Sequence, residues 1–179
     1  DKWGCSASAS PLVTGWLPVH RKLEETVCEW HDFPSGLVWT SGFQANRAIL
    51  GLLPQKGDLV LADRLIHRSM ITGILESRAQ FRRYRHLDLN HLSDLLERES
   101  ARFDRVFVVT ESVFSMDGDA PDLERMSELK TQYGFIWMVD EAHALGWYGS
   151  NGSGLVESAG AGDCVDILVG TFGKALGSQ

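Results

Sequence analysis

The sequence has no long apolar segment, few cysteines and no excess of basic residues. No apolar run approaches the roughly 20 residues needed to span a bilayer, so we expect no membrane partner. The 24 acidic residues outnumber the 17 lysines and arginines, and the formal net charge is -7. Because proteins bind nucleic acids through strongly basic surfaces, this charge argues against a nucleic-acid partner.

The three cysteines indicate neither a metal site nor a disulfide framework. Cys5, Cys28 and Cys164 are widely spaced, so they form no metal-like pair and no even disulfide set. Unpaired thiols are simplest to reconcile with a reducing compartment. Residues 1–4 lead into a small polar loop and do not resemble a signal peptide. We therefore expect a cytoplasmic protein.

The residues that are present suffice for one domain with a sizeable core. The chain has 179 residues, of which 44% are hydrophobic and 23% are charged, as in soluble globular proteins. Residues 4–15 are rich in Ser, Ala and Gly and predict a loop, and the glycine-rich residues 146–154 predict another. The sequence shows no internal repeat and no domain boundary.

Apolar segments alternate with amphipathic segments along most of the chain. Strands are predicted at residues 36–40, 58–62, 81–85, 105–110, 135–140 and 165–169. Helices are predicted at residues 20–30, after the N-cap Ser41, up to about 77, at 91–98 and from about 121 to a C-cap at Gly134. This alternation predicts an α/β fold, with a mostly parallel sheet and helices on both faces.

Two neighbouring strands of this sheet are expected to deliver a set of reactive side chains to one rim. Asp140 ends the strand at 135–140 and His143 follows it, while Lys174 follows the strand at 165–169. The carboxyl ends of strands are where open α/β sheets bind ligands. We therefore expect Asp140, His143 and Lys174 to lie close together.

These three residue types suit one cofactor. A lysine can form a Schiff base with an aldehyde, and an aspartate facing a pyridinium nitrogen keeps that ring able to accept electrons. A nearby histidine can hydrogen-bond a phenolic oxygen of the same ring. The cofactor with these groups is pyridoxal 5'-phosphate (PLP). Taken singly, each residue fits a structural role better, for example a buried ion-paired aspartate or a solvated lysine, but their joint placement favours PLP.

Three further segments carry candidate groups near the same rim. Ser41 and Gly42 open a helix whose exposed N–H groups suit a phosphate, although an ordinary capped helix explains them as well. His67 lies just past a strand end, where it could stack on an aromatic ring or serve the structure alone. Glu111 and Ser115 lie in the polar loop after the strand at 105–110, where active-site loops emerge.

Taken in order, these motifs resemble the α-oxoamine synthase family of PLP enzymes, of fold type I. The residues that carry the resemblance are 14–15, 20–24, 41–46, Asp63, His67, 110–119, 140–143 and 171–174. The motif at 110–119 is very specific to this family. The motifs Asp140-Glu141-Ala142-His143 and Thr171-Phe172-Gly173-Lys174 recur more widely among fold-type-I enzymes.

The resemblance implies four catalytic residues. Lys174 is expected to hold PLP through a Schiff base and then to act as acid and base at the substrate α-carbon. Asp140 is expected to pair with the pyridine nitrogen, and His143 to contact the side of the ring that carries the oxygen. His67 is expected to stack on the face of the ring.

The resemblance also implies further cofactor contacts. Gly42, Phe43 and Thr171 are expected to hold the phosphate. Ser115 is expected to lie beside the ring oxygen, and Glu111 to support the site from behind. The implied reaction condenses an amino acid with an acyl-CoA or acyl-carrier-protein thioester, with loss of CoA or the carrier and of CO2. The implied assembly is a homodimer whose partner subunit completes the site.

Other functions of the same fold remain open at this point. An aminotransferase or an amino-acid lyase would use the same lysine and aspartate, and a noncatalytic paralogue would retain the fold for dimerisation. Family members also start earlier and continue well beyond the lysine. Residues 1–179 are therefore expected to form part of a large PLP-binding domain, with a C-terminal small domain and a carboxylate-binding arginine lying outside the chain. Residues 6–11 and Arg68 depart from the family pattern.

Overall fold

The computed structural model describes residues 4 and 6–178, so the expectations for residues 1–3 and for Cys5 lie outside the described residues. The chain divides into two compact units, Asp1–Trp39 and Thr40–Gln179. Within the described part of the chain, Cys28 and Cys164 are free thiols, as expected. Among these residues, every helix is too short or too polar to serve as a membrane span.

The described residues of the first unit form two helices and correct two predictions. A π-helical turn, η1 (Pro11–Gly15), replaces the end of the predicted loop, and α1 (Pro18–His31) extends the predicted helix. At Gly15 the chain passes so close to Ala9 that a Cβ would lie 1.9 Å from its carbonyl oxygen, so only glycine permits this turn. The strand predicted at 36–40 does not form, because Val38 donates its N–H to the Glu24 carboxylate and not to a neighbouring strand.

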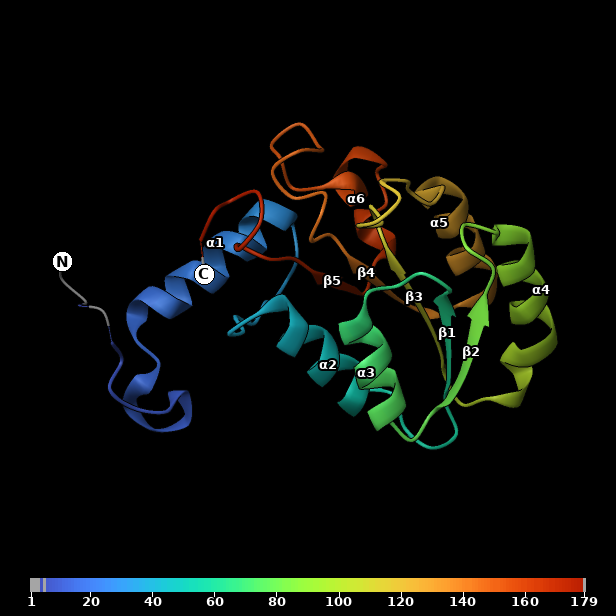
Figure 1. Ribbon diagram of the computed structural model, residues 1–179, viewed down its shortest axis with the longest axis horizontal. Helices are drawn as coiled ribbons and strands as arrows, with labels where there is room; N and C mark the ends of the chain where they lie inside the picture. Colours follow the sequence, from blue (N-terminus) through green and yellow to red (C-terminus); the bar gives the residue numbers. More distant parts are fainter. Residues whose placement is uncertain (1–3, 5, 179) are drawn as a thin grey trace. The chain divides into compact units, whose positions relative to one another are not determined.

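The second unit is built on a five-stranded sheet in which every pair of neighbours is parallel (Figure 1). Its strand order is β2-β1-β3-β4-β5. The strands are β1 (Leu59–Asp63), β2 (Gln80–Tyr84), β3 (Val106–Glu111), β4 (Ile136–Asp140) and β5 (Ile167–Val169). All five were predicted to within two residues, and β2 and β5 lie at the edges of the sheet.

Helices follow the strands as the predicted α/β fold requires. They are α2 (Gly42–Leu52), α3 (Arg68–Glu76), α4 (Leu89–Glu99), α5 (Leu123–Tyr133) and the short α6 (Leu155–Ser158), with 3-10 turns η2 (Ser100–Arg102) and η3 (Gly162–Cys164). The predicted caps are present: the Ser41 hydroxyl accepts from the N–H of Gln44, and Gly134 ends α5 with a φ of 66°. The sequence did not predict α6, η2 or η3.

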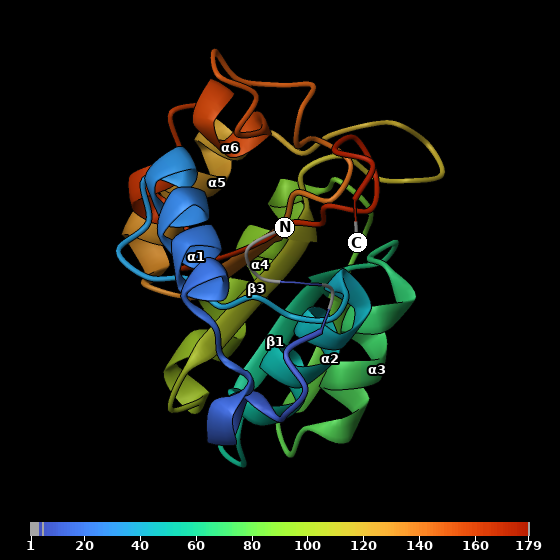
Figure 2. The same ribbon diagram turned by 90° about the vertical axis from the view of Figure 1, so that its left-hand side faces the viewer.

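Figure 2 shows the sheet between α2 and α3 on one side and α4 and α5 on the other. Buried side chains of α2 and α3 pack against alternate strand residues, which are Val60, Ala62, Phe107, Val109, Met138 and Val169. Because side chains alternate along a strand, the buried Leu61, Val108 and Val139 point to the opposite face. The prediction of helices on both faces of the sheet is confirmed.

All strands of a parallel sheet end at the same edge, so the loops that follow them emerge together (Figure 2). The register sets which ends are neighbours: Glu111 of β3 lies opposite Asp140 of β4, and Asp140 lies opposite Val169 of β5. The three strand ends that carry the predicted site are therefore adjacent in the sheet.

A buried glutamate anchors the loop after β4. The Glu141 carboxylate accepts from the Ser112 hydroxyl at 2.7 Å and from the backbone N–H groups of Leu155 and Val156 at 3.1 and 2.6 Å. Glu141 has no exposed surface, and burial raises its pKa. A Cβ on Gly154 would lie 2.6 Å from the carboxylate, so the first turn of α6 can approach only through glycine.

We expect Glu141→Ala to lower the free energy of unfolding by about 3 kcal/mol, because it leaves several buried donors without a partner. Urea unfolding of the complete protein measures this loss. Glu128→Ala, on the exposed side of α5, is the control and is expected to change stability by less than about 0.5 kcal/mol. Equal effects of the two substitutions would contradict the anchoring role of Glu141.

Candidate active site

The ends of β4 and β5 bring a lysine and a histidine into direct contact. Lys174 Nζ lies 2.7 Å from His143 Nε2, although the two residues are 31 positions apart in the chain. Asp140 comes from the end of the same strand that leads to His143. The two neighbouring strands thus place the three residues at one rim, as the sequence predicted.

The electrostatic environment of Lys174 favours loss of its proton. Desolvation lowers the pKa of the Lys174 ammonium, while the carboxylates of Asp140 and Glu111 act in the opposite direction. Desolvation and the neighbouring Lys174 charge also lower the pKa of His143. A neutral His143 ring can accept a hydrogen bond from the lysine through Nε2. The pair therefore presents an amine that is easier to deprotonate than a solvated lysine, which is what nucleophilic chemistry requires.

Asp140 is held by two donors and has 5% of its surface exposed. The Asn46 side chain donates to Oδ2 at 2.7 Å, and the backbone N–H of Ala142 donates to Oδ1 at 2.9 Å. These two hydrogen bonds fix the orientation of the carboxylate. The arrangement therefore offers a fixed negative charge at the end of β4.

A chain of hydrogen bonds joins Asp140 to His67. Asn46 Nδ2 also lies 3.0 Å from the Ser69 hydroxyl oxygen, and that oxygen lies 2.7 Å from His67 Nδ1. The backbone N–H of Ser69 donates to the same Nδ1, so His67 serves as the N-cap of α3. Because Nδ1 accepts this bond, we assign the neutral ring with its proton on Nε2. The exposed face of His67 remains available for stacking.

The N-terminus of α2 lies beside the start of the loop after β5. A Cβ on Gly42 would lie 3.6 Å from the Thr171 Cβ and 3.7 Å from the carbonyl oxygen of Gly170. The first N–H groups of a helix have no partner inside the helix and suit an anion. Phe43 follows Gly42, and its ring meets the edge of the His67 ring at a centroid distance of 6.3 Å. Gly42, Phe43 and Thr171 thus surround one small region next to His67.

Glu111 is a buried carboxyl group that titrates near neutral pH. It is 2% exposed, and burial, followed by the nearby Asp140 charge, raises its pKa from about 4.5 to about 7. The backbone N–H groups of His67 and Ser115 and the Lys174 charge act in the opposite direction. Its Oε1 atom has no hydrogen-bond partner among the described residues.

We expect Glu111 to make the protein less stable as the pH rises. A raised pKa in the folded state means that stability falls between about pH 4.5, where the unfolded chain ionises, and about pH 7, where the folded protein does. The shift corresponds to roughly 3 kcal/mol, which solvent screening reduces to about 2 kcal/mol. Urea unfolding of wild type and Glu111→Gln across this range tests the sign, and a constant difference between the two proteins would contradict it.

The structure brings all nine predicted site residues into one connected set. Contacts or electrostatic interactions link Gly42 to Thr171, Phe43 to His67, and Glu111 to His67, Ser115, Asp140 and Lys174, while Lys174 contacts His143. The sequence did not assign roles to Asn46 and Ser69, which tie Asp140 to His67. Asn46 belongs to the 41–46 motif, and its place one helical turn after Gly42 was the available signal.

Comparisons with known proteins identify relatives along almost the whole chain. Residues 7–179 match the family described as aminotransferase class I and II. The 8-amino-7-oxononanoate synthase of Chlorobaculum parvum is 47% identical over 177 residues, which cover 99% of this chain and 45% of that protein. A putative 8-amino-7-oxononanoate synthase of Haemophilus influenzae is 50% identical over 175 residues, covering 97% of this chain and 46% of that protein. The chain thus spans about half the length of these curated relatives.

Solved structures give the same picture. Serine palmitoyltransferase of Sphingomonas wittichii has a TM-score of 0.94 at 33% identity and covers 99% of this chain and 44% of its own. The S. paucimobilis serine palmitoyltransferase with a bound PLP–myriocin aldimine has a TM-score of 0.93 at 31% identity, over 99% of this chain and 46% of its own. The 8-amino-7-oxononanoate synthase of Francisella tularensis has a TM-score of 0.80 at 32% identity, over 99% and 48%.

Proposed function

Because the chain belongs to the aminotransferase class I and II family, we propose that the complete protein is a PLP-dependent C-acyltransferase of the α-oxoamine synthase type. It condenses an amino acid with an acyl thioester. The observation that carries the proposal is Lys174 Nζ at 2.7 Å from His143 Nε2, beside the buried carboxylate of Asp140. The names of the relatives point to the same class of enzyme.

The residues at the rim fit PLP. A lysine with a lowered pKa suits the aldehyde, a fixed carboxylate suits the pyridine nitrogen, and the first N–H groups of α2 suit the phosphate. In support, one structural relative is described with PLP bound as a myriocin adduct. When bound, PLP supplies an electron sink for a carbanion at the amino-acid α-carbon.

The position of each site residue determines its role in the proposed reaction. Lys174 moves a proton at the substrate α-carbon, and the neutral His143 accepts its hydrogen bond between transfers. Asp140 supplies negative charge at the ring nitrogen, and Asn46 keeps the carboxylate aimed there. The neutral His67 ring offers a flat surface that excludes water from one face of the site.

The phosphate and ring-oxygen contacts come from loops and a helix end. Gly42, Phe43 and Thr171 hold the phosphate through the N-terminus of α2 and the loop after β5. Ser115 and His143 contact the ring oxygen from the loops after β3 and β4. Glu111 supports Ser115 and His67 from beneath, since it interacts with the backbone N–H groups of both.

Within this class we propose L-alanine and a pimeloyl thioester as substrates, giving 8-amino-7-oxononanoate for biotin synthesis. The support is that two curated relatives with this name are 47% and 50% identical to the chain. Among the solved structures, the 8-amino-7-oxononanoate synthase of F. tularensis and the serine palmitoyltransferases are about equally similar, at 31–33% identity. The stretch 82–92, with its run of arginines, His86 and Asp88, modestly favours the same choice. The alternatives are serine, glycine or another acyl thioester in the same reaction.

A thiol-release assay tests the reaction class. The complete protein with PLP is incubated with L-alanine, glycine or L-serine and with pimeloyl-, acetyl-, succinyl- or palmitoyl-CoA, and free CoA is measured. The proposal expects CoA and CO2 in equal amounts, most rapidly with L-alanine and pimeloyl-CoA. Ammonia or a keto acid without CoA would instead indicate a lyase or an aminotransferase.

The proposal extends to the organisation of the protein. We place residues 1–179 in a large PLP-binding domain, with a small C-terminal domain outside this chain and a homodimer in the cytoplasm as the working form. Two exposed apolar side chains on loops of the second unit, Met116 and Trp147 at 90% and 79% exposure, are suited to a subunit contact. Light scattering of the complete protein at two concentrations measures the assembly state.

A further inference from the structure

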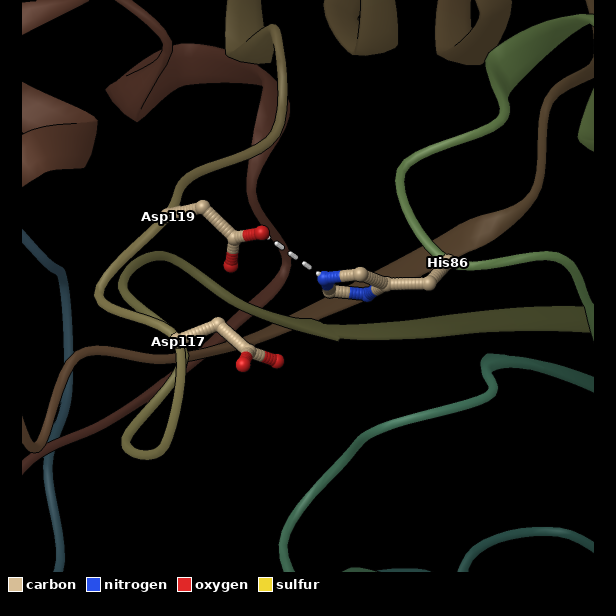
Figure 3. Close-up of side chains that lie close together, drawn as sticks. All are labelled: His86, Asp117 and Asp119. Atoms are coloured by element: carbon tan, nitrogen blue, oxygen red, sulfur yellow. Dashed lines mark hydrogen bonds and ion pairs between the residues drawn. The ribbon is translucent and has the colours of Figure 1, made fainter.

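A second polar cluster lies at the ends of β1, β2 and β3, apart from the residues assigned to the cofactor. His86 follows β2, Asp63 ends β1, and Asp119 closes the loop after β3 that carries Ser115. His86 Nδ1 lies 2.8 Å from Asp63 Oδ1. On the other side of the ring, Nε2 lies 3.0 Å from Asp119 Oδ2, a contact that Figure 3 shows. One imidazole ring therefore lies between the carboxylate at the end of β1 and a carboxylate of the loop after β3.

This arrangement requires a doubly protonated ring. A carboxylate only accepts hydrogen bonds, so each ring nitrogen must carry a proton to donate to its own partner. A neutral imidazole has one N–H and could satisfy only one of the two carboxylates. His86, Asp117 and Asp119 lie close together and could hold a metal ion (Figure 3). A protonated His86 ring explains this grouping without a metal, because the ring itself supplies the positive charge that offsets the two carboxylates.

On one side of the His86 ring, Asp63 is buried and held by further hydrogen bonds. Asp63 has no exposed surface, and it also accepts from the backbone N–H groups of Leu65 at 2.8 Å and Leu87 at 2.9 Å. Leu87 has a φ of 55°, a conformation that a leucine rarely adopts without being held there. Asp63 therefore fixes the turn that carries His86 as well as the ring.

On its other side, the His86 ring contacts the loop after β3 through Asp119. The loop folds back on itself through two bonds between backbone groups, from Phe114 N–H to Asp119 O at 2.9 Å and from Gly118 N–H to Phe114 O at 2.8 Å. The buried Phe114 ring meets the His86 ring edge-on at a centroid distance of 4.6 Å. Ser115 lies between these anchor points, so its position depends on the contact between His86 and Asp119.

Building on the function proposed above, we propose that His86 is a positioning residue: its protonated ring ties Asp119 to Asp63 and so holds the Ser115 loop in place for the cofactor. When the ring loses a proton, the remaining N–H stays with Asp63, because a buried carboxylate loses more on losing its donor than one that water can reach. Asp119 is 39% exposed at its side chain and can be solvated instead. The loop is then released.

The surroundings of His86 fix the direction of the pH effect. Asp63, Asp119 and Asp117 face it with negative charge, the buried Tyr84 lies near Asp63 with a raised pKa, and the neighbouring Arg85 is paired with Asp88 at 2.7 Å. Burial opposes protonation, but the two carboxylate partners prevail and the pKa of His86 is raised. We call the bridge from Asp63 through protonated His86 to Asp119 the latch. It is therefore complete below about pH 6.5, and it is lost as the pH rises through the raised pKa of His86.

Hydrogen exchange of the complete protein without PLP, followed by mass spectrometry of the peptide that spans 112–119, tests the latch at about pH 6 and about pH 9. After correction for the intrinsic exchange rate, wild type is expected to lose about tenfold protection in this peptide between the lower and the higher pH. His86→Asn keeps an amide donor near Asp63 but does not reach Asp119, so its loop is expected to be unprotected at both pH values. The peptide covering β1 is the internal reference.

Two matched substitutions separate the latch from a general structural effect. In Asp119→Asn the amide accepts from a protonated Nε2 and donates to an unprotonated one, so protection is expected to be the same at both pH values. Asp117→Asn removes the neighbouring carboxylate that Figure 3 leaves without a bond to the ring, and it is expected to keep the wild-type pH step. A pH step that survives in Asp119→Asn, or wild-type protection in His86→Asn, would overturn the proposal.

The experiment is independent of the proposed reaction. If the complete protein released no CoA, the exchange results would still decide the role of His86. Protection that is restored at high pH by Mn²⁺ or Zn²⁺, and abolished by EDTA at low pH, would overturn the latch in favour of a cation site. If both proposals hold, Asp119→Asn is also expected to flatten the alkaline limb of the activity profile at unchanged KM, which a loss of folding alone would not do.

Discussion

Replacing Lys174 with alanine is expected to remove the absorbance band of bound PLP from the complete protein and to slow CoA release by at least about 10³-fold. Alanine has neither an amine for the aldehyde nor a group that can carry a proton at the α-carbon. The lysine is the predicted residue whose neighbourhood the structure describes most directly, since its Nζ lies 2.7 Å from His143 and interacts with the charges of Asp140 and Glu111.

The same variant has a readout that does not depend on catalysis. The Lys174 charge helps to lower the pKa of His143, so its removal is expected to shift the His143 titration upward in NMR spectra of the protein without PLP. Lys56→Ala, in an exposed turn before β1, is the matched control and is expected to change neither the band nor the titration. An intact PLP band in Lys174→Ala would remove the basis of the proposed function.

Replacing Asp140 with asparagine is expected to slow CoA release by about 10²–10³-fold, the usual cost of removing one preorganised charge from an active site. The fold is expected to survive, because the amide oxygen introduced by Asp140→Asn can still accept from the N–H of Ala142. Asn46 Oδ1, a buried atom without a partner among the described residues, can turn to accept from the new amide. The loss would therefore reflect the missing charge at the ring nitrogen.

Glu111 provides a test of that explanation. Asp140 helps to raise the pKa of Glu111, so Asp140→Asn is expected to shrink the pH-dependent stability difference that Glu111→Gln produces. Asp94→Asn, exposed on α4, serves as the control for both measurements. Unchanged CoA release in Asp140→Asn would argue that a different group faces the ring nitrogen.

The sheet was predictable because its strands carry a strong local signal. Each of β1, β3 and β4 begins with a continuous apolar run and ends in a carboxylate, and such runs predict strands that are buried on both faces. The strand predicted at 36–40 was wrong because an apolar run does not show whether a neighbouring strand is there to pair with it. Leu37, Val38 and Trp39 form an equally apolar run, but the N–H of Val38 goes to a side chain and not to a neighbouring strand, and local pattern does not report the neighbour.

The candidate site was predictable in its outline but not in its supports. Asp140, His143 and Lys174 follow strand ends, so adjacency in a parallel sheet brings them together. Asn46 is 94 positions from Asp140, and Asp63 is 23 positions from His86. Side-chain pairs at such separations depend on strand order and helix placement, which no local pattern contains. The supports of the site therefore emerge only with the fold.

Two adjacent carboxylates at the end of β4 have separate tasks. Asp140 meets Asn46 from α2, whereas Glu141 meets Ser112 and the first turn of α6. The reactive rim and the scaffold beneath it are thus encoded by consecutive codons yet draw on different neighbours. Directed evolution can therefore vary position 140 in search of new chemistry with little loss in the free energy of unfolding, provided that position 141 is kept as glutamate.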